Sequence, residues 1–117
     1  MLKLLRFACI LFFASSAFAT ANSLDITYVD PDTEIRNLIW EKRPVLVFSN
    51  SHLDPNLKQQ IKMFASDPNA LLSRDVQVFV DHTPEPNSNL RKRFRPKGFL
   101  IILIGKDGQI KLRKNTP

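Results

Sequence analysis

Apolar positions gather in five short segments of this chain, with polar turns or loops between them. The run at residues 45–48 is uninterrupted, which is typical of a parallel strand buried on both faces. Segments with strand character lie at residues 24–29, 45–48, 76–80, 99–104 and 109–113. The sequence Lys106-Asp107-Gly108 predicts a hairpin between the last two, because Asp-Gly tolerates the positive φ of a tight turn.

Helical signals separate the first four of these strands. An aspartate that can cap a helix precedes a proline that fits its first position. Such pairs are Asp30-Pro31, Asp54-Pro55 and Asp67-Pro68. The first two predict helices, and the third indicates either a kink or a new short helix through Leu72. A further short helix is expected at residues 89–94.

The apolar spacing within two of these helices predicts which faces are buried. Leu57, Ile61 and Phe64 keep the i, i+4, i+7 spacing of a stripe that faces the core. The helix that begins at Pro31 is expected to end at Trp40. Together with its neighbour Ile39, this tryptophan is expected to seal the helix against the sheet, because large aromatic side chains are mostly packing residues.

The resulting order is β-α-β-α-β-α-β-β, which predicts an α/β protein of the thioredoxin-like class. It would be a three-layer sandwich with a mixed sheet that ends in a β-hairpin, because strands joined through helices favour right-handed parallel crossovers. A helix usually follows the last hairpin of this fold, and none is predicted here. We therefore expect either a curtailed fold or a truncated member of the class.

The N-terminal residues 1–19 have the features of a secretory signal peptide. Lys3 and Arg6 precede an apolar run at residues 7–14, and Ala17-Phe18-Ala19 forms a small-x-small cleavage site. Cleavage between Ala19 and Thr20 would leave one domain at residues 20–117, in the periplasm or secreted. The apolar run is shorter than the ~20 residues of a membrane span, so no stable span is expected.

Charge is distributed unevenly along the predicted mature chain. Without Lys3 and Arg6, 15 of the 17 basic residues remain against 11 acidic ones, a net charge of +4. Residues 20–90 hold 10 acidic and 6 basic side chains, whereas residues 91–117 hold 9 basic and 1 acidic. Such asymmetry attracts anionic partners. Export excludes nucleic acid as a partner and leaves an acidic protein or another anionic ligand of the periplasm.

Several stretches of the chain resemble one family of proteins. They are Arg43-Pro44-Val45-Leu46-Val47-Phe48, Ser73-Arg74-Asp75-Val76, Leu90-Arg91, Arg95-Pro96-Lys97-Gly98-Phe99 and Leu103-Ile104-Gly105-Lys106-Asp107-Gly108. They are similar to the bacterial thioredoxin-like domain-of-unknown-function family, which is related to the P-DUDES module of sushi-repeat and coiled-coil extracellular-matrix proteins. The resemblance covers about residues 38–113. It implies a thioredoxin-like fold, secretion and no assigned activity, and the matrix relatives suggest a role in binding.

Thiol–disulfide chemistry is excluded from the predicted mature chain. A thioredoxin site needs two cysteines at C-x-x-C spacing where a helix begins. The only cysteine is Cys9, within the predicted leader, and the corresponding loop at residues 49–54 reads Ser-Asn-Ser-His-Leu-Asp. No cofactor is therefore expected, and any enzymatic role remains open.

Candidate ligand-binding residues follow the strands at 45–48 and 76–80, whose carboxyl ends should share one edge of the sheet. They are His52, Asp54, Asp81 and His82. Two histidines and two aspartates could bind a divalent metal, although Asp54 is also an expected helix cap and Asp81 can stabilise the loop. Ser49 and Ser51 beside His52 admit a hydrolase, but no nucleophile elbow surrounds them.

A dense basic cluster follows in the sequence. It comprises Arg91, Lys92, Arg93, Arg95 and Lys97, and we expect Lys106, Lys111, Arg113 and Lys114 to extend it. Such a cluster is either a solvated surface or a site for an anionic partner. Two hypotheses follow. The chain is a non-enzymatic binding module that uses this cluster or the loops, or it is a metal-dependent or otherwise unrecognised enzyme built on His52, Asp54, Asp81 and His82.

Overall fold

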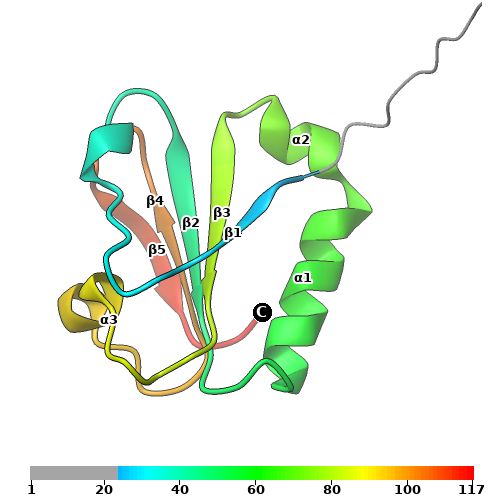
Figure 1. Ribbon diagram of the computed structural model, residues 1–117. Coiled ribbons are helices and arrows are strands. Elements are labelled where there is room, and N and C mark those ends of the chain that lie inside the picture. The colour runs from blue at the N-terminus through cyan, green and yellow to red at the C-terminus, as the bar shows by residue number, and fades with distance from the viewer. Residues whose placement is uncertain (1–23) are drawn as a thin grey trace, which may run out of the picture.

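The computed structural model of the protein describes residues 24–117 (Figure 1). The predicted leader, with Cys9 and the cleavage site between Ala19 and Thr20, lies outside the described residues. The described chain forms strands, α-helices and one 3-10 turn. In chain order they are β1 (Ile26–Tyr28), η2 (Arg36–Leu38, the 3-10 turn), β2 (Arg43–Phe48), α1 (Pro55–Ser66), α2 (Pro68–Leu72), β3 (Val76–Asp81), α3 (Asn89–Phe94), β4 (Leu100–Ile104) and β5 (Ile110–Lys114).

The strands form one mixed sheet in the order β1-β3-β2-β4-β5. Strands β1, β3 and β2 are parallel, with Val45 of β2 opposite Val78 of β3. Strand β4 runs antiparallel to β2, and β5 returns antiparallel to β4 as the second arm of the predicted hairpin. This α/β architecture is compatible with a thioredoxin-like fold, and the expected fold class and terminal hairpin are confirmed.

Each face of the sheet carries its own hydrophobic core, because side chains of a strand alternate between the faces. Leu46 and Phe48 of β2 join the core covered by α3 and the segment around η2. Their neighbours Val45 and Val47 join the second core, which α1 and α2 cover. Figure 1 shows these two helical groups on opposite sides of the sheet, so the predicted three layers are present.

The local signals for α1, α2 and the hairpin are confirmed. Asp54 and Asp67 cap α1 and α2, each accepting a hydrogen bond from a backbone N–H two or three residues on. The pair at residues 67–68 therefore begins a new helix, one of the two predicted alternatives. Gly108 adopts a φ of 82° in the hairpin, a backbone conformation that glycine adopts without steric cost.

The predicted helix from Pro31 to Trp40 is wrong. The Asp30 carboxylate accepts hydrogen bonds from the Asp32 N–H and the Thr33 hydroxyl, and this local turn replaces a helix cap. Only η2 is helical in this stretch. Trp40 has a φ of 69°, is 72% exposed, and donates its N–H to the Lys106 carbonyl at 2.6 Å. It therefore does not seal a helix against the sheet.

Ile35 provides the apolar contact of this segment with the sheet. Its side chain is buried in the same core as Leu46, and Leu38 packs against that core from the 3-10 turn. Ile39, by contrast, is partly exposed. None of the helices within residues 24–117 has the length and hydropathy of a membrane-spanning segment.

Candidate functional site

The loops that follow β2 and β3 meet at one edge of the sheet, as expected for neighbouring parallel strands. The Ser49 N–H donates a hydrogen bond to the Asp81 carbonyl at 2.9 Å, directly beyond the last residues of β2. Farther along these loops, the rings of His52 and His82 lie with their centroids 5.9 Å apart. The structure thus brings the two predicted histidines together.

A buried ion pair holds this edge together. Arg91 of α3 is 6% exposed, and its Nε lies 3.0 Å from Oδ1 of Asp81, which is 2% exposed. The same guanidinium donates hydrogen bonds from Nη2 to the backbone carbonyls of Ser49 and Asp81. The second Asp81 oxygen, Oδ2, accepts a hydrogen bond from the Ser88 hydroxyl at 2.7 Å.

Ser88 links this ion pair to the start of α3. Its hydroxyl oxygen accepts a hydrogen bond from the Arg91 N–H at 3.1 Å, which makes Ser88 the cap of the helix. Both carboxylate oxygens of Asp81 and the backbone carbonyls of Ser49 and Asp81 are therefore satisfied within the protein. The network fixes the ends of β2 and β3 to α3.

The placement of Arg91 corrects one sequence-based expectation. Arg91 belongs to the interior and not to an exposed basic cluster, because its charge is compensated by Asp81. Helical spacing contained the signal for this. Arg91 follows Leu90 and precedes Phe94 by three positions, so all three residues share the inner face of α3, and all three are buried. Asp81 is likewise engaged and does not face an open site.

Asp54 has the structural role that its position before Pro55 predicts. Its Oδ1 accepts a hydrogen bond from the Asn56 N–H, and its Oδ2 accepts one from the hydroxyl of Ser49 at 2.9 Å. The Ser49 hydroxyl also lies 2.8 Å from the Ser51 carbonyl. Ser49 is fully buried and is bonded to no histidine, which is not the arrangement of an activated serine nucleophile.

The two histidines form an aromatic cluster with Tyr28. The ring of His82 packs at 5.5 Å from the Tyr28 ring and at an angle of 57° to it. Its Nδ1 is buried and makes no hydrogen bond within the described chain. Among residues 24–117, no three side chains of the His, Cys, Asp or Glu types are grouped so that they could hold a metal ion. The four-residue set of His52, Asp54, Asp81 and His82 is therefore not assembled as a metal centre.

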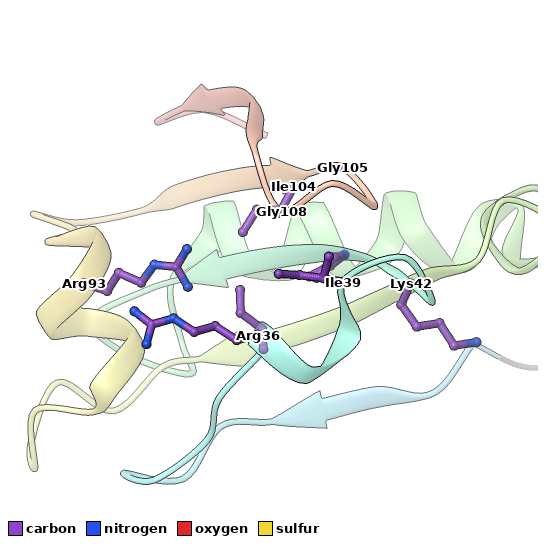
Figure 2. Close-up of a pocket in the computed structure, with 9 residues that line it drawn as sticks. Arg36, Ile39, Lys42, Arg93, Ile104, Gly105 and Gly108 are labelled. Carbon is purple, nitrogen blue, oxygen red and sulfur yellow. The ribbon is translucent and has the colours of Figure 1, made fainter.

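Arg93 points away from its basic neighbours in the sequence. Its guanidinium lies over the Phe94 ring, 4.7 Å from the centroid, in a cation–π contact. It lines a narrow crevice between α3 and the η2 segment, together with Arg36 and Ile39. Figure 2 shows the side chains of Arg36 and Arg93 pointing toward each other across this crevice. Nothing in the sequence pattern indicated Arg36, which is 57 positions away.

Arg95 and Lys97 lie in a different place, on an open cleft at the carboxyl edge. This cleft of about 730 Å³ is also lined by Arg113 and Lys114 from the end of β5. Among the residues that the structure describes, no aspartate or glutamate lines it. A smaller cleft of about 490 Å³ shares Arg95, is also lined by Lys92, and likewise has no acidic lining residue. We call the four residues Arg95, Lys97, Arg113 and Lys114 the basic cleft.

Ion pairing distinguishes the cations of the basic cleft from Lys106 and Lys111, which lie in and next to the hairpin turn. Lys106 is paired with Asp75 at 2.6 Å, and Lys111 with Asp107 at 3.0 Å. The hydrogen bond from Lys106 and its positive charge hold the pKa of Asp75 below the usual value. The pKa of Asp107 is also lowered. The largest cause is the hydrogen bond that its carboxylate accepts from the backbone N–H of Gln109, and the second is the hydrogen bond from Lys111.

None of the basic-cleft residues takes part in the ion pairs formed among residues 24–117. Arg113 alone is fixed, by a hydrogen bond from its Nη2 to the Phe94 carbonyl at 2.9 Å. That bond leaves its positive charge uncompensated by any carboxylate. Positive charge therefore accumulates at this edge of the molecule.

The fold and the site together define a small α/β domain whose described part has a uniformly basic cleft and contains no cysteine. Residues 34–117 match the family described as "Domain of unknown function (DUF4174)", and the chain belongs to this family. A comparison with curated proteins found no match.

Proposed function

We propose that this protein is an exported, non-redox binding module that captures an anionic partner in its basic cleft. The observation that carries the proposal is the convergence of four cations on one open cleft that no acidic side chain lines. A concave surface of one charge sign attracts ligands of the opposite sign. The cations come from two separate segments, the turn after α3 and the end of β5, and only the fold unites them.

Export and the absence of redox chemistry are part of the proposal. The leader-like composition of residues 1–19 supports export, and a chain that begins at Thr20 has no thiol with which to exchange disulfides. The strand order is compatible with a thioredoxin-like domain. We extend the proposal to kinship with such domains and with the P-DUDES module, on the resemblance of the motifs at residues 95–99 and 103–108. N-terminal sequencing of the protein after cell fractionation tests the export step. A periplasmic protein that begins at Thr20 is expected, and a protein found only in the cytoplasm with its leader intact contradicts export.

Charge reversal tests the basic cleft. Lys97 and Lys114 are exposed, and within residues 24–117 their ammonium groups make no hydrogen bond and no ion pair. Their double substitution Lys97→Glu/Lys114→Glu is expected to weaken binding of a fluorescein-labelled oligoglutamate at least about tenfold at low salt, since two attractions become repulsions. Fluorescence anisotropy measures the affinity, which should also fall as salt rises.

The matched control is Lys58→Glu/Lys62→Glu, which makes the same change of net charge on the exposed face of α1, outside the basic cleft. It is expected to retain most of the affinity. Phosphatidylglycerol vesicles serve as a second anionic probe in a co-sedimentation assay. The proposal fails if neither probe binds at low salt, or if the control pair of substitutions weakens binding as much as the cleft pair.

A metal-dependent enzyme is the second candidate function predicted from the sequence. The contact between the two histidines of the predicted ligand set favours it. The contact between His52 and His82 leaves two imidazoles together at the sheet edge. The aspartates that would complete the ligand set are engaged elsewhere, Asp81 by Arg91 and Asp54 by the start of α1. Native mass spectrometry with Zn²⁺ tests this candidate, and stoichiometric binding lost in His52→Ala would support it over the first.

A further inference from the structure

The outer edge of β5 is unpaired in the described chain. Strand β5 is the last strand in the sheet order and pairs with β4 alone among residues 24–117. All five of its residues are exposed. Such an edge presents a row of backbone N–H and C=O groups that can pair with another strand.

The composition of β5 determines what kind of strand it can accept. Its residues are, in order, Ile110, Lys111, Leu112, Arg113 and Lys114, and the two apolar ones, Ile110 and Leu112, are 49% and 41% exposed. Charges of this kind protect an edge against pairing with a second copy, because two β5 strands would place like charges against each other. The same charges favour an acidic strand.

The edge is continuous with the basic cleft. Arg113 and Lys114 belong both to β5 and to the cleft, and Arg95 and Lys97 extend the positive surface beyond the end of the strand. At the other end of β5, Lys111 lines an apolar cleft of about 370 Å³ with Trp40 and Leu103. A chain segment lying along the outer edge of β5 would thus reach the cationic surface at the end of the strand.

We propose that β5 accepts an acidic, extended polypeptide segment of another protein as a sixth strand, with its carboxylates placed along the basic cleft. Backbone hydrogen bonds would provide affinity, and the charges would select the partner. This inference rests on the proposed anion-binding function and specifies its ligand as a polypeptide.

A pair of peptides separates backbone pairing from charge attraction. The first is a fluorescein-labelled peptide of alternating glutamate and valine, and the second is the same peptide with alternate backbone nitrogens methylated. Methylation removes the N–H donors and keeps every charge. Two methylated versions, one for each register, are needed because only alternate N–H groups of a strand face its neighbour.

We expect the unmodified peptide to bind, and one methylated version to bind about tenfold or more weakly, since it loses two or three backbone hydrogen bonds. Amide hydrogen exchange in β5 should slow when the unmodified peptide is added. A peptide of alternating lysine and valine should not bind.

Each contrary result has a distinct meaning. If all acidic peptides bind equally and β5 exchange is unchanged, strand addition is overturned while the anion-binding function stands. The same holds if phosphatidylglycerol vesicles bind and the peptides do not. If no anionic probe binds, both proposals fail. Sedimentation of the peptide-free protein as a dimer that shows β5 protection would assign the edge to a second copy and overturn the inference.

Discussion

Loss of the Arg91 guanidinium should destabilise the protein more than loss of any exposed cation. Arg91→Met keeps much of the length and apolar volume of the side chain but removes its charge and donors. The Asp81 carboxylate would then remain 2% exposed without its ionic partner. Two backbone carbonyls, of Ser49 and Asp81, would lose the donor that they share.

The expected loss of unfolding free energy follows from these lost interactions. Breaking a buried ion pair by removing one partner typically costs about 3–5 kcal/mol, because the remaining charge is buried and uncompensated. Whole domains of this size are stable by roughly 5–15 kcal/mol. Since a loss of 1 kcal/mol lowers the melting temperature of such a domain by about 4–8 °C, we expect Arg91→Met to lower it by at least about 12 °C.

The measurement is thermal and urea unfolding followed by circular dichroism, with three further variants for comparison, one of which is the single change Asp81→Leu. Arg93→Met makes the same chemical change on the exposed side of the same helix and should alter stability by only about 0.5 kcal/mol. The double variant Arg91→Met/Asp81→Leu removes both charges and should recover part of the loss.

Two outcomes would refute the argument. One is a cost for Arg91→Met as small as that for Arg93→Met, which would mean that the pair contributes little to stability. The other is a double variant that loses as much as the sum of both single changes. That result would show that the ion pair itself is not the source of the effect.

Three further predictions concern local features of the fold. Gly108→Ala should lower the free energy of unfolding by roughly 1–2 kcal/mol in urea, because position 108 has a φ of 82° and an added Cβ would lie 3.3 Å from Cδ1 of Ile39. A neutral effect would contradict the assigned turn. Asp54→Ala should lower the free energy of unfolding by about 1–2 kcal/mol. The loss should exceed that for Asp67→Ala at the cap of α2, since Asp54 also accepts a hydrogen bond from the Ser49 hydroxyl. Equal losses would argue against a contribution of that bond. The folded-state pKa of Asp75 is depressed by Lys106, so its contribution to stability is present above the usual value of 3.8 and is lost as pH falls through the lower folded value. Lys106→Met should raise the pKa of Asp75 in an NMR titration, and an unchanged value would refute the pairing.

Much of the sheet could be predicted because its signals are local. Buried strands such as β2 and β4 are apolar on both faces, and an Asp-Pro pair indicates a helix start within a few residues. Asp30-Pro31 shows where this reasoning fails. The same pair makes a turn there, because Thr33 offers a hydroxyl donor to the Asp30 carboxylate, and sequence alone does not rank the two arrangements.

The candidate site could be predicted only in part. Whether a cationic side chain lies in the interior, in a crevice or on an open cleft depends on residues that are distant in the sequence. Arg91, Arg93 and Arg95 alternate in sequence but end in the interior, in the crevice and on the basic cleft, respectively. Helical spacing could have placed Arg91 beside Leu90 and Phe94. The arrival of Arg113 at the same cleft depends on the register of β5 against β4, which shifts between Leu103 and Ile104 and is not specified by the hairpin signal.

The exposed indole of Trp40 gives the molecule a natural optical probe. It is the only tryptophan of the chain, and its backbone is bonded to Lys106 in the hairpin that leads into β5. Its emission should therefore report on the polarity of its surroundings at that end of the sheet. Occupation of the neighbouring apolar cleft would shift the emission to shorter wavelength and could be followed without attaching a dye.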